Sequence, residues 1–532
     1  MAEQNHECFE VYITRKGPVL VSGPNRVAIL HSVIGRSESN TKAVELCSVT
    51  ADTKLPKSSI FSTLEDLVKK NVLRYGSAYG KKGYELDSYR IISSAEPHPE
   101  YSNFGKELVK NSPEGYTMDR MELDYMATAA LTYGMDISPL MKTIGYDFGK
   151  YIKRLFPDTD EALERLFEWY RRHGSAEVRI TSRLPLSVEV DYALRSVGGD
   201  LAKTFSCLVL QSVAAIVEDG YRAIIESIEV KDNHVTGTFR SDASVNDRDL
   251  VPSDFGYDED ASNDFMIYIT PLGAFRCVDN PLGLAILDSM KNDVPMSSAE
   301  ITRSLRVGER KPQSSVLFYL EKMIDIGLVK ETEILGKRKF VKVAGNLYSW
   351  NLDRITEPYD PFEHFHESFD DPSSANGHIL SAMARRLGSL RIAINPIIGR
   401  LGESLAREFC SLSERKTIES ILSVVMDRAN WFRFSETSVT SFVPFTFVRK
   451  LDPNVDDIFM DTQMVFDTTF FKTIIKEITG VEYGSECTMY NSGESRGYKL
   501  VYQLRSRWIR TNLTEYQFDY SHNERRGPRT PV

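Results

Sequence analysis

The sequence predicts an α+β protein with an internal duplication, and two observations support this fold class. The first is a repeat in which Val11-Tyr12-Ile13-Thr14 recurs as Ile267-Tyr268-Ile269-Thr270, while Gly17 recurs 256 residues later as Gly273. The second is that each half contains apolar residues at helical spacing as well as strand-like alternation. Half of the chain is therefore the structural unit, and we expect the molecule to bind its ligand in pairs.

Length and composition narrow the class of protein. A chain of 532 residues is too long for one core, so four domains are expected, two in each half. No apolar run reaches the roughly 18 residues that a membrane span needs, and residues 1–10 are too polar for a secretory signal. The six cysteines are scattered without a Cys-x-x-Cys pair, which fits reduced thiols and gives no zinc-site spacing. We therefore expect a cytoplasmic protein with no membrane contact, no metal, no cofactor and no catalytic residues.

Acidic residues are concentrated where the first repeat ends. The formal net charge is −10, which by itself is unfavourable for binding phosphate groups. Between Asp242 and Asp264 there are eight acids and one base, Arg248, so the rest of the chain carries a net charge of only −3. The same stretch is rich in Ser, Asn, Gly and Pro, which predicts a solvated linker between the halves.

The first domain of each half is predicted to contain a strand, three helices and a β-hairpin. The strand covers residues 11–14 or 267–270, and Ser297-Ser298 with Glu300 indicates the start of the second helix of the later copy. Pro312 opens the third helix there, because proline is tolerated in a first turn. That helix has one apolar face in both copies: Ile60, Leu64, Leu67 and Val68, and Val316, Leu320, Met323 and Ile324.

The second domain of each half is predicted to be α+β. Apolar residues recur at every fourth position of its first helix, at Leu140, Ile144, Phe148 and Ile152 and again at Ile397, Leu401, Leu405 and Phe409. Another helix, alternating strands, a further helix and a closing hairpin follow. The predicted boundaries are 1–92 and 265–350 for the first domains, 116–241 and 378–510 for the second domains, 93–115, 242–264 and 351–377 for linkers, and 511–532 for a tail.

The first domains contain the candidate DNA-binding residues. A recognition helix needs short polar residues at its amino-terminal end, where backbone amides face phosphates and base edges. A hairpin beside it needs cations, and glycine at its bend supplies positive φ. The candidates are Lys57, Ser58, Ser59 and Ser62 with the hairpin residues Lys81 and Lys82, and Gln313, Ser314 and Ser315 with the hairpin residues Lys337, Arg338 and Lys339.

These residues carry a resemblance to a known family. The succession Leu284-Ala285-Ile286-Leu287, Ala299-Glu300-Ile301, Ser314-Ser315-Val316 and Gly327-Leu328-Val329, with a basic Gly-Lys-Arg-Lys tip, resembles the ArsR-like winged-helix regulators of prokaryotes. The resemblance implies two winged-helix domains in a nucleoid-associated archaeal regulator that binds double-stranded DNA. Homodimerisation would raise the number of winged helices to four. The alternatives are a chromatin-like protein that bridges DNA and winged helices used only for protein contact.

The order of helices, strands, helix and closing hairpin in the second domains resembles the four-vinyl-reductase family, whose members bind small molecules, and the output domains of methanogen regulators. The resemblance implies a sensor for a small hydrophobic effector, or a tetrapyrrole-type carrier that uses its winged helices for protein docking. The candidate ligand residues are apolar or sulfur-containing, and their alternative role is simply to form the core. They are Phe148, Trp169, Cys207, Leu405, Phe432, Phe471 and Cys487. A metal site at His364 and His366 is the weaker idea, because no second ligand cluster accompanies them.

Overall fold

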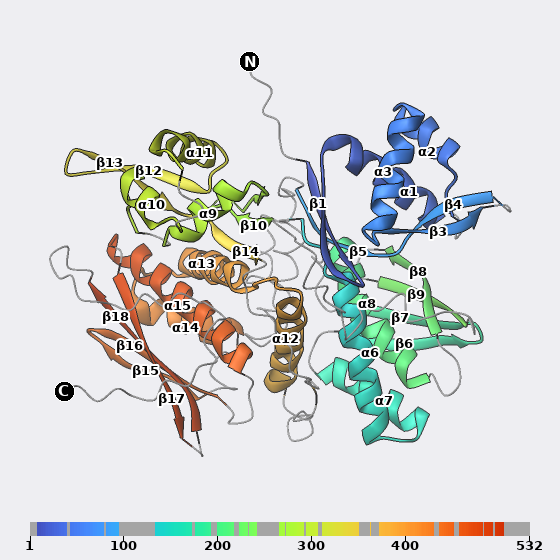
Figure 1. Cartoon of the computed structure of the whole chain (residues 1–532). Coiled ribbons are helices and arrows are strands. Elements are labelled where there is room, and N and C mark those ends of the chain that lie inside the picture. Colours follow the sequence, from blue (N-terminus) through green and yellow to red (C-terminus); the bar gives the residue numbers. More distant parts are fainter. Residues whose placement is uncertain are drawn as a thin grey trace.

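The computed structural model describes residues 8–39, 43–78, 81–94, 134–172, 176–192, 199–217, 223–231, 234–241, 265–271, 273–291, 294–306, 311–349, 362, 372–429, 436–451, 457–481, 483–492 and 495–504. It is a mixed α+β protein with several small antiparallel sheets (Figure 1). The predicted acidic linker, most of the linker at 93–115, the tail, Phe432, His364 and His366 lie outside these residues.

Module 1 is our name for residues 8–94. Its elements are β1 (Phe9–Thr14), β2 (Gly17–Ser22), α1 (Pro24–Ser39), α2 (Leu46–Thr53), α3 (Lys57–Lys69), β3 (Leu73–Ala78), β4 (Lys81–Leu86) and β5 (Tyr89–Ser93). Strands β2, β1 and β5 form one sheet in that order, while β3 and β4 form a separate hairpin. A single bridge between Val44 and Tyr84 joins the segment before α2 to this hairpin.

Module 2 is residues 265–349. Its elements are β10 (Met266–Ile269), β11 (Phe275–Val278), α9 (Pro281–Ser289), α10 (Ser298–Ser304), α11 (Gln313–Asp325), β12 (Val329–Ile334), β13 (Lys337–Lys342) and β14 (Gly345–Ser349). The sheet order is β11-β10-β14, β12 pairs with β13, and a bridge joins Met296 to Phe340.

Several local predictions in the modules are confirmed. Ser297 caps α10, and its side chain and that of Glu300 form a reciprocal capping box. The apolar stripes of α3 and α11 point inward, because Ile60, Leu64, Val316 and Leu320 are fully buried. Strands β2, β5, β11 and β14 were not among the predicted elements; each pairs with β1 or β10.

The bends of the two hairpins differ from the prediction. In module 2 the two-residue turn is Leu335-Gly336, with φ of 53° and 70°, and Lys337 already pairs with Ile334 across the strands. Both turn residues need positive φ in such a turn, which explains the glycine. In module 1 the pair Lys81-Lys82 begins strand β4, and Gly83 lies inside that strand. The cations therefore occupy the return strands beside the bends.

Sheet domain 1 is residues 134–241. It contains α6 (Ser138–Leu155), α7 (Thr159–Arg172), β6 (Ala176–Arg183), β7 (Leu186–Tyr192), α8 (Gly199–Val217), β8 (Ala223–Lys231) and β9 (His234–Ser241), and the sheet order is β6-β7-β9-β8. Side chains alternate between buried and half-buried along β7, as expected for a sheet with one covered face.

Sheet domain 2 is residues 372–504. It contains α12 (Pro372–Ser389), α13 (Asn395–Leu412), α14 (Ile418–Ala429), β15 (Glu436–Phe442), β16 (Phe445–Leu451), α15 (Asp457–Thr479), β17 (Tyr483–Ser492) and β18 (Ser495–Leu504), and the sheet order is β15-β16-β18-β17. Helix α12 begins at Pro372, inside the segment 351–377 that was predicted to be a linker. Phe362, in the same segment, is fully buried.

Each module is attached to its sheet domain through a shared layer. Strand β1 is buried on both faces: Val11 and Ile13 belong to the large core of the sheet domains, whereas Tyr12 belongs to the core of module 1. The side chains of strand β10 are likewise shared between two cores, because Ile267 belongs to the large core and Tyr268 belongs to the core of module 2. The modules are therefore held by packing in addition to their covalent connections.

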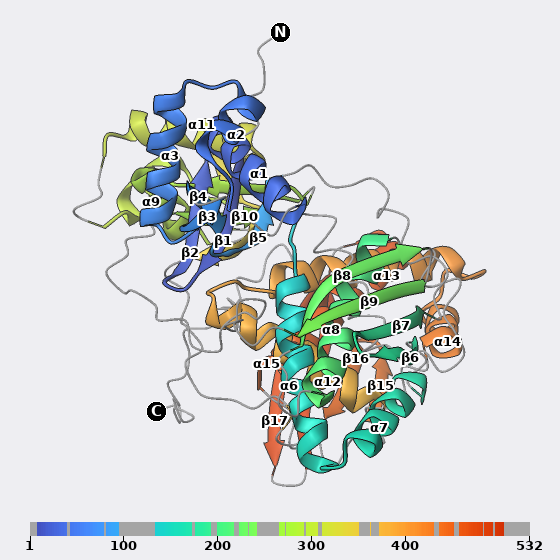
Figure 2. The same ribbon diagram turned by 90° about the vertical axis from the view of Figure 1, so that its right-hand side faces the viewer.

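The two halves also share this large core. Phe362 packs against Phe148 and Tyr151, with ring centroids 5.1 and 6.0 Å apart, and Arg386 on α12 donates to Asp147 on α6 at 2.6 Å. Helix α12 lies between the halves in Figure 1, and Figures 1 and 2 agree that both modules lie at the same end of the molecule. Among the described residues, no helix is both long enough and apolar enough to cross a membrane.

Candidate nucleic-acid interface

The predicted recognition residues of module 1 lie together on the outer face of α3. Lys57, Ser58, Ser59 and Ser62 are all exposed. Pro56 precedes the helix and provides no side-chain cap, so the first backbone amides of α3 remain available to an acceptor from outside. The positive end of the helix dipole adds to the attraction that Lys57 exerts on an anion.

The matching residues of module 2 differ from one another in exposure. Gln313 and Ser314 are exposed at the start of α11, whereas Ser315 is half-buried. The Gln313 amide donates from Nε2 to Ser298 Oγ at 2.8 Å, which ties the start of α11 to α10. Pro312 again provides no side-chain cap.

The two hairpin cations of module 1 lie beside different carboxylates, Lys82 beside Glu65 on α3 and Lys81 beside Glu45. Lys82 Nζ is 3.4 Å from Glu65 Oε1 and 3.8 Å from the centre of the Tyr75 ring. The hydroxyls of Tyr75 and Tyr84 donate to the same carboxylate, and the Tyr75 bond is the main reason why the pKa of Glu65 is lowered. The side chain of Lys81 is 74% exposed and 3.9 Å from Glu45. Lys81 is therefore better placed than Lys82 to contact a phosphate.

In module 2 the three predicted cations have different surroundings. Lys337 is exposed beside the turn, and Arg338 donates to Glu331 at 2.8 Å. Lys339 is only 18% exposed and pairs with Glu300 at 2.6 Å, which holds β13 against α10. The hydrogen bond from Lys339 is the main cause that lowers the pKa of Glu300 to about 2. Lys339 therefore braces the hairpin internally, and Lys337 remains the most accessible of the three.

Positive charge is concentrated in the two modules. Residues 8–94 contain 13 Lys and Arg against 8 Asp and Glu, and residues 265–349 contain 12 against 9. The modules thus have net charges of +5 and +3 in a chain of −10, so the remainder carries −18. An anionic polymer would be attracted to the modules and repelled by the rest of the molecule.

Six of the predicted ligand residues are described by the structure, and they pack in or against the core. Phe148, Trp169, Cys207, Leu405 and Phe471 are at most 2% exposed, and the Phe148 and Trp169 rings pack at 5.0 Å. The thiol of Cys487 lies against Met464, at 3.0 Å from its sulfur, and burial raises the pKa of that thiol to about 12. These residues form the packed interior of the sheet domains.

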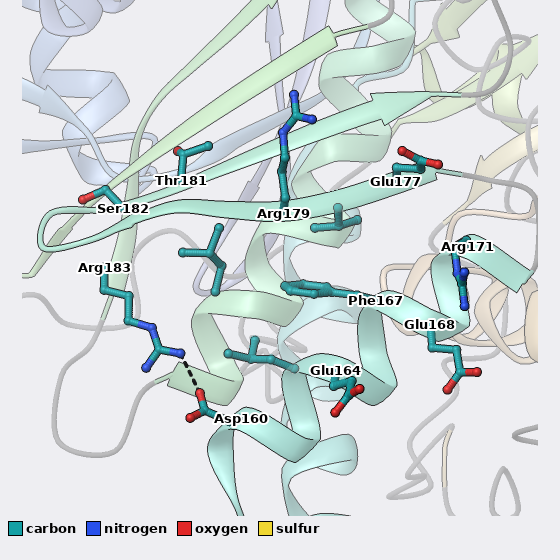
Figure 3. Close-up of a pocket in the computed structure, with 13 residues that line it drawn as sticks. Asp160, Glu164, Phe167, Glu168, Arg171, Glu177, Arg179, Thr181, Ser182 and Arg183 are labelled. Atoms are coloured by element: carbon teal, nitrogen blue, oxygen red, sulfur yellow. Dashed lines mark hydrogen bonds and ion pairs between the residues drawn. The ribbon is translucent and has the colours of Figure 1, made fainter.

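An open groove of about 960 Å³ lies elsewhere, between α7 and the edge strand β6 (Figure 3). Its apolar floor consists of Leu163, Phe167, Val178 and Ile180, and charged side chains surround that floor. Arg183 pairs with Asp160 at 2.6 Å across one end. Sequence reasoning missed this groove, because its residues are an ordinary helix face and an ordinary strand until the two elements meet.

Comparisons of the chain with family models, with curated proteins and with solved structures found no match. Function is therefore inferred from the geometry and charges of the chain itself.

Proposed function

We propose that modules 1 and 2 are winged-helix domains and that the chain is a DNA-binding transcription regulator similar to the ArsR-like family. The concentration of positive charge in the modules is the main support. Three helices followed by a β-hairpin, with a bridge at Val44–Tyr84 or Met296–Phe340, are also what a winged helix requires. In this proposal α3 and α11 enter the major groove, and the hairpins contact the adjacent backbone.

An internal duplication accounts for the second module. Among the described elements, the order from β1 to β9 recurs from β10 to β18 with α12 in addition, and both four-stranded sheets have the same strand order. Gly145 and Gly402, which are 257 residues apart, each lie at the contact between two core helices. One chain would thereby present two recognition helices, as dimeric regulators do with two subunits.

Salt dependence of binding to duplex DNA tests the proposal. Removing one cation that contacts a phosphate should reduce the slope of log affinity against log salt by about one. We expect the Lys81→Ala and Lys337→Ala double variant to lower that slope by about two and to weaken binding to all sequences. The control is Lys499→Ala, which removes an exposed cation from sheet domain 2.

Fluorescence anisotropy between low and physiological salt provides the measurement. An affinity that is independent of salt, or an equally weakened affinity in the control and the double variant, would contradict DNA binding by the modules. Mapping of bound sites in cells then separates a regulator, which gives sharp peaks at promoters, from a chromatin-like protein, which gives broad coverage.

A further inference from the structure

The outer faces of α3 and α11 carry different side chains at the centre of the helix. Val316, Leu320 and Met323 define the buried side of α11, and Phe318 lies nearly opposite to them at 100° per residue. Its side chain is 53% exposed. The sixth residue of α3, at the same place on that helix, is the exposed Ser62, whereas Phe61, which is 47% exposed, lies 100° away from Ser62 around the helix.

Polar chemistry surrounds the Phe318 ring on α11. The ammonium of Lys322 lies 4.6 Å from the centre of the ring, and Ser314 is exposed one turn earlier. A cation beside an aromatic ring suits a partner that is itself negatively charged and offers a small apolar group at the centre of the contact. A largely apolar protein surface would instead leave Lys322 desolvated without an anion.

The major groove of DNA offers that combination. The 5-methyl group of thymine is an apolar group on a base edge there, and phenylalanine is one of the side chains that contact it. Phosphates on either side of the groove supply negative charge for Lys322. A serine at the same position can contact several bases and gains little from a methyl group.

On the basis of the proposed DNA-binding function, we propose that Phe318 recognises the methyl group of a thymine. Ser62 of module 1 does not recognise one. Module 2 then selects a half-site containing thymine at the position that its helix centre meets, while module 1 selects a different half-site. The natural binding site is accordingly asymmetric, although the chain has two similar halves.

Replacement of thymine by deoxyuridine isolates the methyl group, because base pairing is unchanged. The full-length chain is first used to select binding sites from a random duplex library, and each thymine of the selected site is then replaced singly. We expect one replacement, in the half-site of module 2, to weaken binding about fourfold, which corresponds to removal of one buried methyl group.

Variants assign this effect to a residue. Phe318→Ser should bind the thymine and deoxyuridine duplexes equally, and Ser62→Phe should create a second methyl-sensitive position in the half-site of module 1. Phe442→Ser is the matched control, because Phe442 is 47% exposed on sheet domain 2. All three replaced residues are exposed, and circular dichroism checks that the variants fold.

The outcomes separate this proposal from the proposed function. Absence of salt-dependent DNA binding would overturn both. Salt-dependent binding in which Phe318→Ser keeps the fourfold difference would overturn only the role of Phe318. The role of Phe318 in DNA recognition would also be overturned if Phe318→Ser left DNA binding and thymine preference intact but abolished capture of a protein partner. Phe318 would then face protein.

Discussion

At the scale of single residues, a buried ion pair distinguishes sheet domain 2 from sheet domain 1. Arg449 Nε lies 2.9 Å from Asp467 Oδ2, and both side chains are at most 2% exposed. Burial raises the pKa of the Asp467 carboxyl, and Arg449 and Tyr498 oppose that rise. Strand register places Val190 and Val235 of sheet domain 1 where Arg449 and Tyr498 lie in sheet domain 2. Sheet domain 1 thus has two apolar side chains where sheet domain 2 has a guanidinium and a phenol.

The pair should be interdependent. Asp467→Leu alone should destabilise sheet domain 2 by about 3–5 kcal/mol, because the Arg449 charge remains buried without its partner. Asp467→Leu combined with Arg449→Met should recover most of that stability, since both charges are then gone and the volume is largely kept. Hydrogen exchange of the α15 amides measures both values. Equal destabilisation in the single and double variants would show that the two side chains are not coupled.

At the scale of elements, two core helices pack closely against each other in each sheet domain. They are α6 and α8 in sheet domain 1 and α13 and α15 in sheet domain 2. A Cβ added to Gly402 on α13 would lie 2.5 Å from Thr469 Oγ1 and 2.7 Å from Phe466 O on α15. Gly145 on α6 has the same relation to the backbone of α8 at Leu208. The helices approach closely because each of these positions lacks a side chain, which gives a physical reason for the glycine at both places in the repeat.

Gly402→Ala should therefore destabilise the chain by about 1–3 kcal/mol through overpacking. Gly399, also on α13, is the matched control, because its added Cβ would be 3.5 Å from Thr469 Cγ2, an ordinary contact. Gly399→Ala should be neutral or stabilise by about 0.4–1 kcal/mol through a less flexible unfolded chain. Thermal unfolding compares the two variants, and similar melting temperatures would count against close packing at Gly402.

At the scale of the whole molecule, the common core fixes the relative position of the two modules. Phe362 packs on α6 of the first half, and the Arg386–Asp147 ion pair lies at the same boundary. Each module is itself held on that core through β1 or β10. A DNA-binding chain built in this way would hold both recognition helices in one arrangement before it meets DNA, which reduces the entropy cost of binding.

Phe362→Ala tests this consequence. The substitution should cost about 3–5 kcal/mol of stability through the cavity that it leaves. It should also weaken binding to a duplex with both half-sites more than to a duplex with one, because looser halves lower the effective concentration of the second module. The ratio of the two affinities is the measurement, with Leu184→Ala, which replaces a side chain that is 93% exposed, as control. An unchanged ratio would show that the core does not orient the modules.

Local signals in the sequence were sufficient for several elements and for the exposed polar face of α3. The stripe through Ile60 and Leu64, the capping box at Ser297, and the polar face around Ser58 each depend on residues within one or two turns. Such patterns are visible in sequence because helix geometry alone brings those side chains together. The hairpin cations were expected at the bends, and they lie instead on the return strands beside the bends.

Only the tertiary structure decided which partners these residues meet. Lys339, one of the predicted DNA contacts, pairs with Glu300, 39 residues away, and strands β2 and β5 are defined by their pairing with β1. Burial of Phe362 and the groove beside Phe167 also depend on elements that are distant along the chain. Sequence periodicity specifies which face of an element is apolar, whereas the identity of the opposing surface depends on how all the elements pack at once.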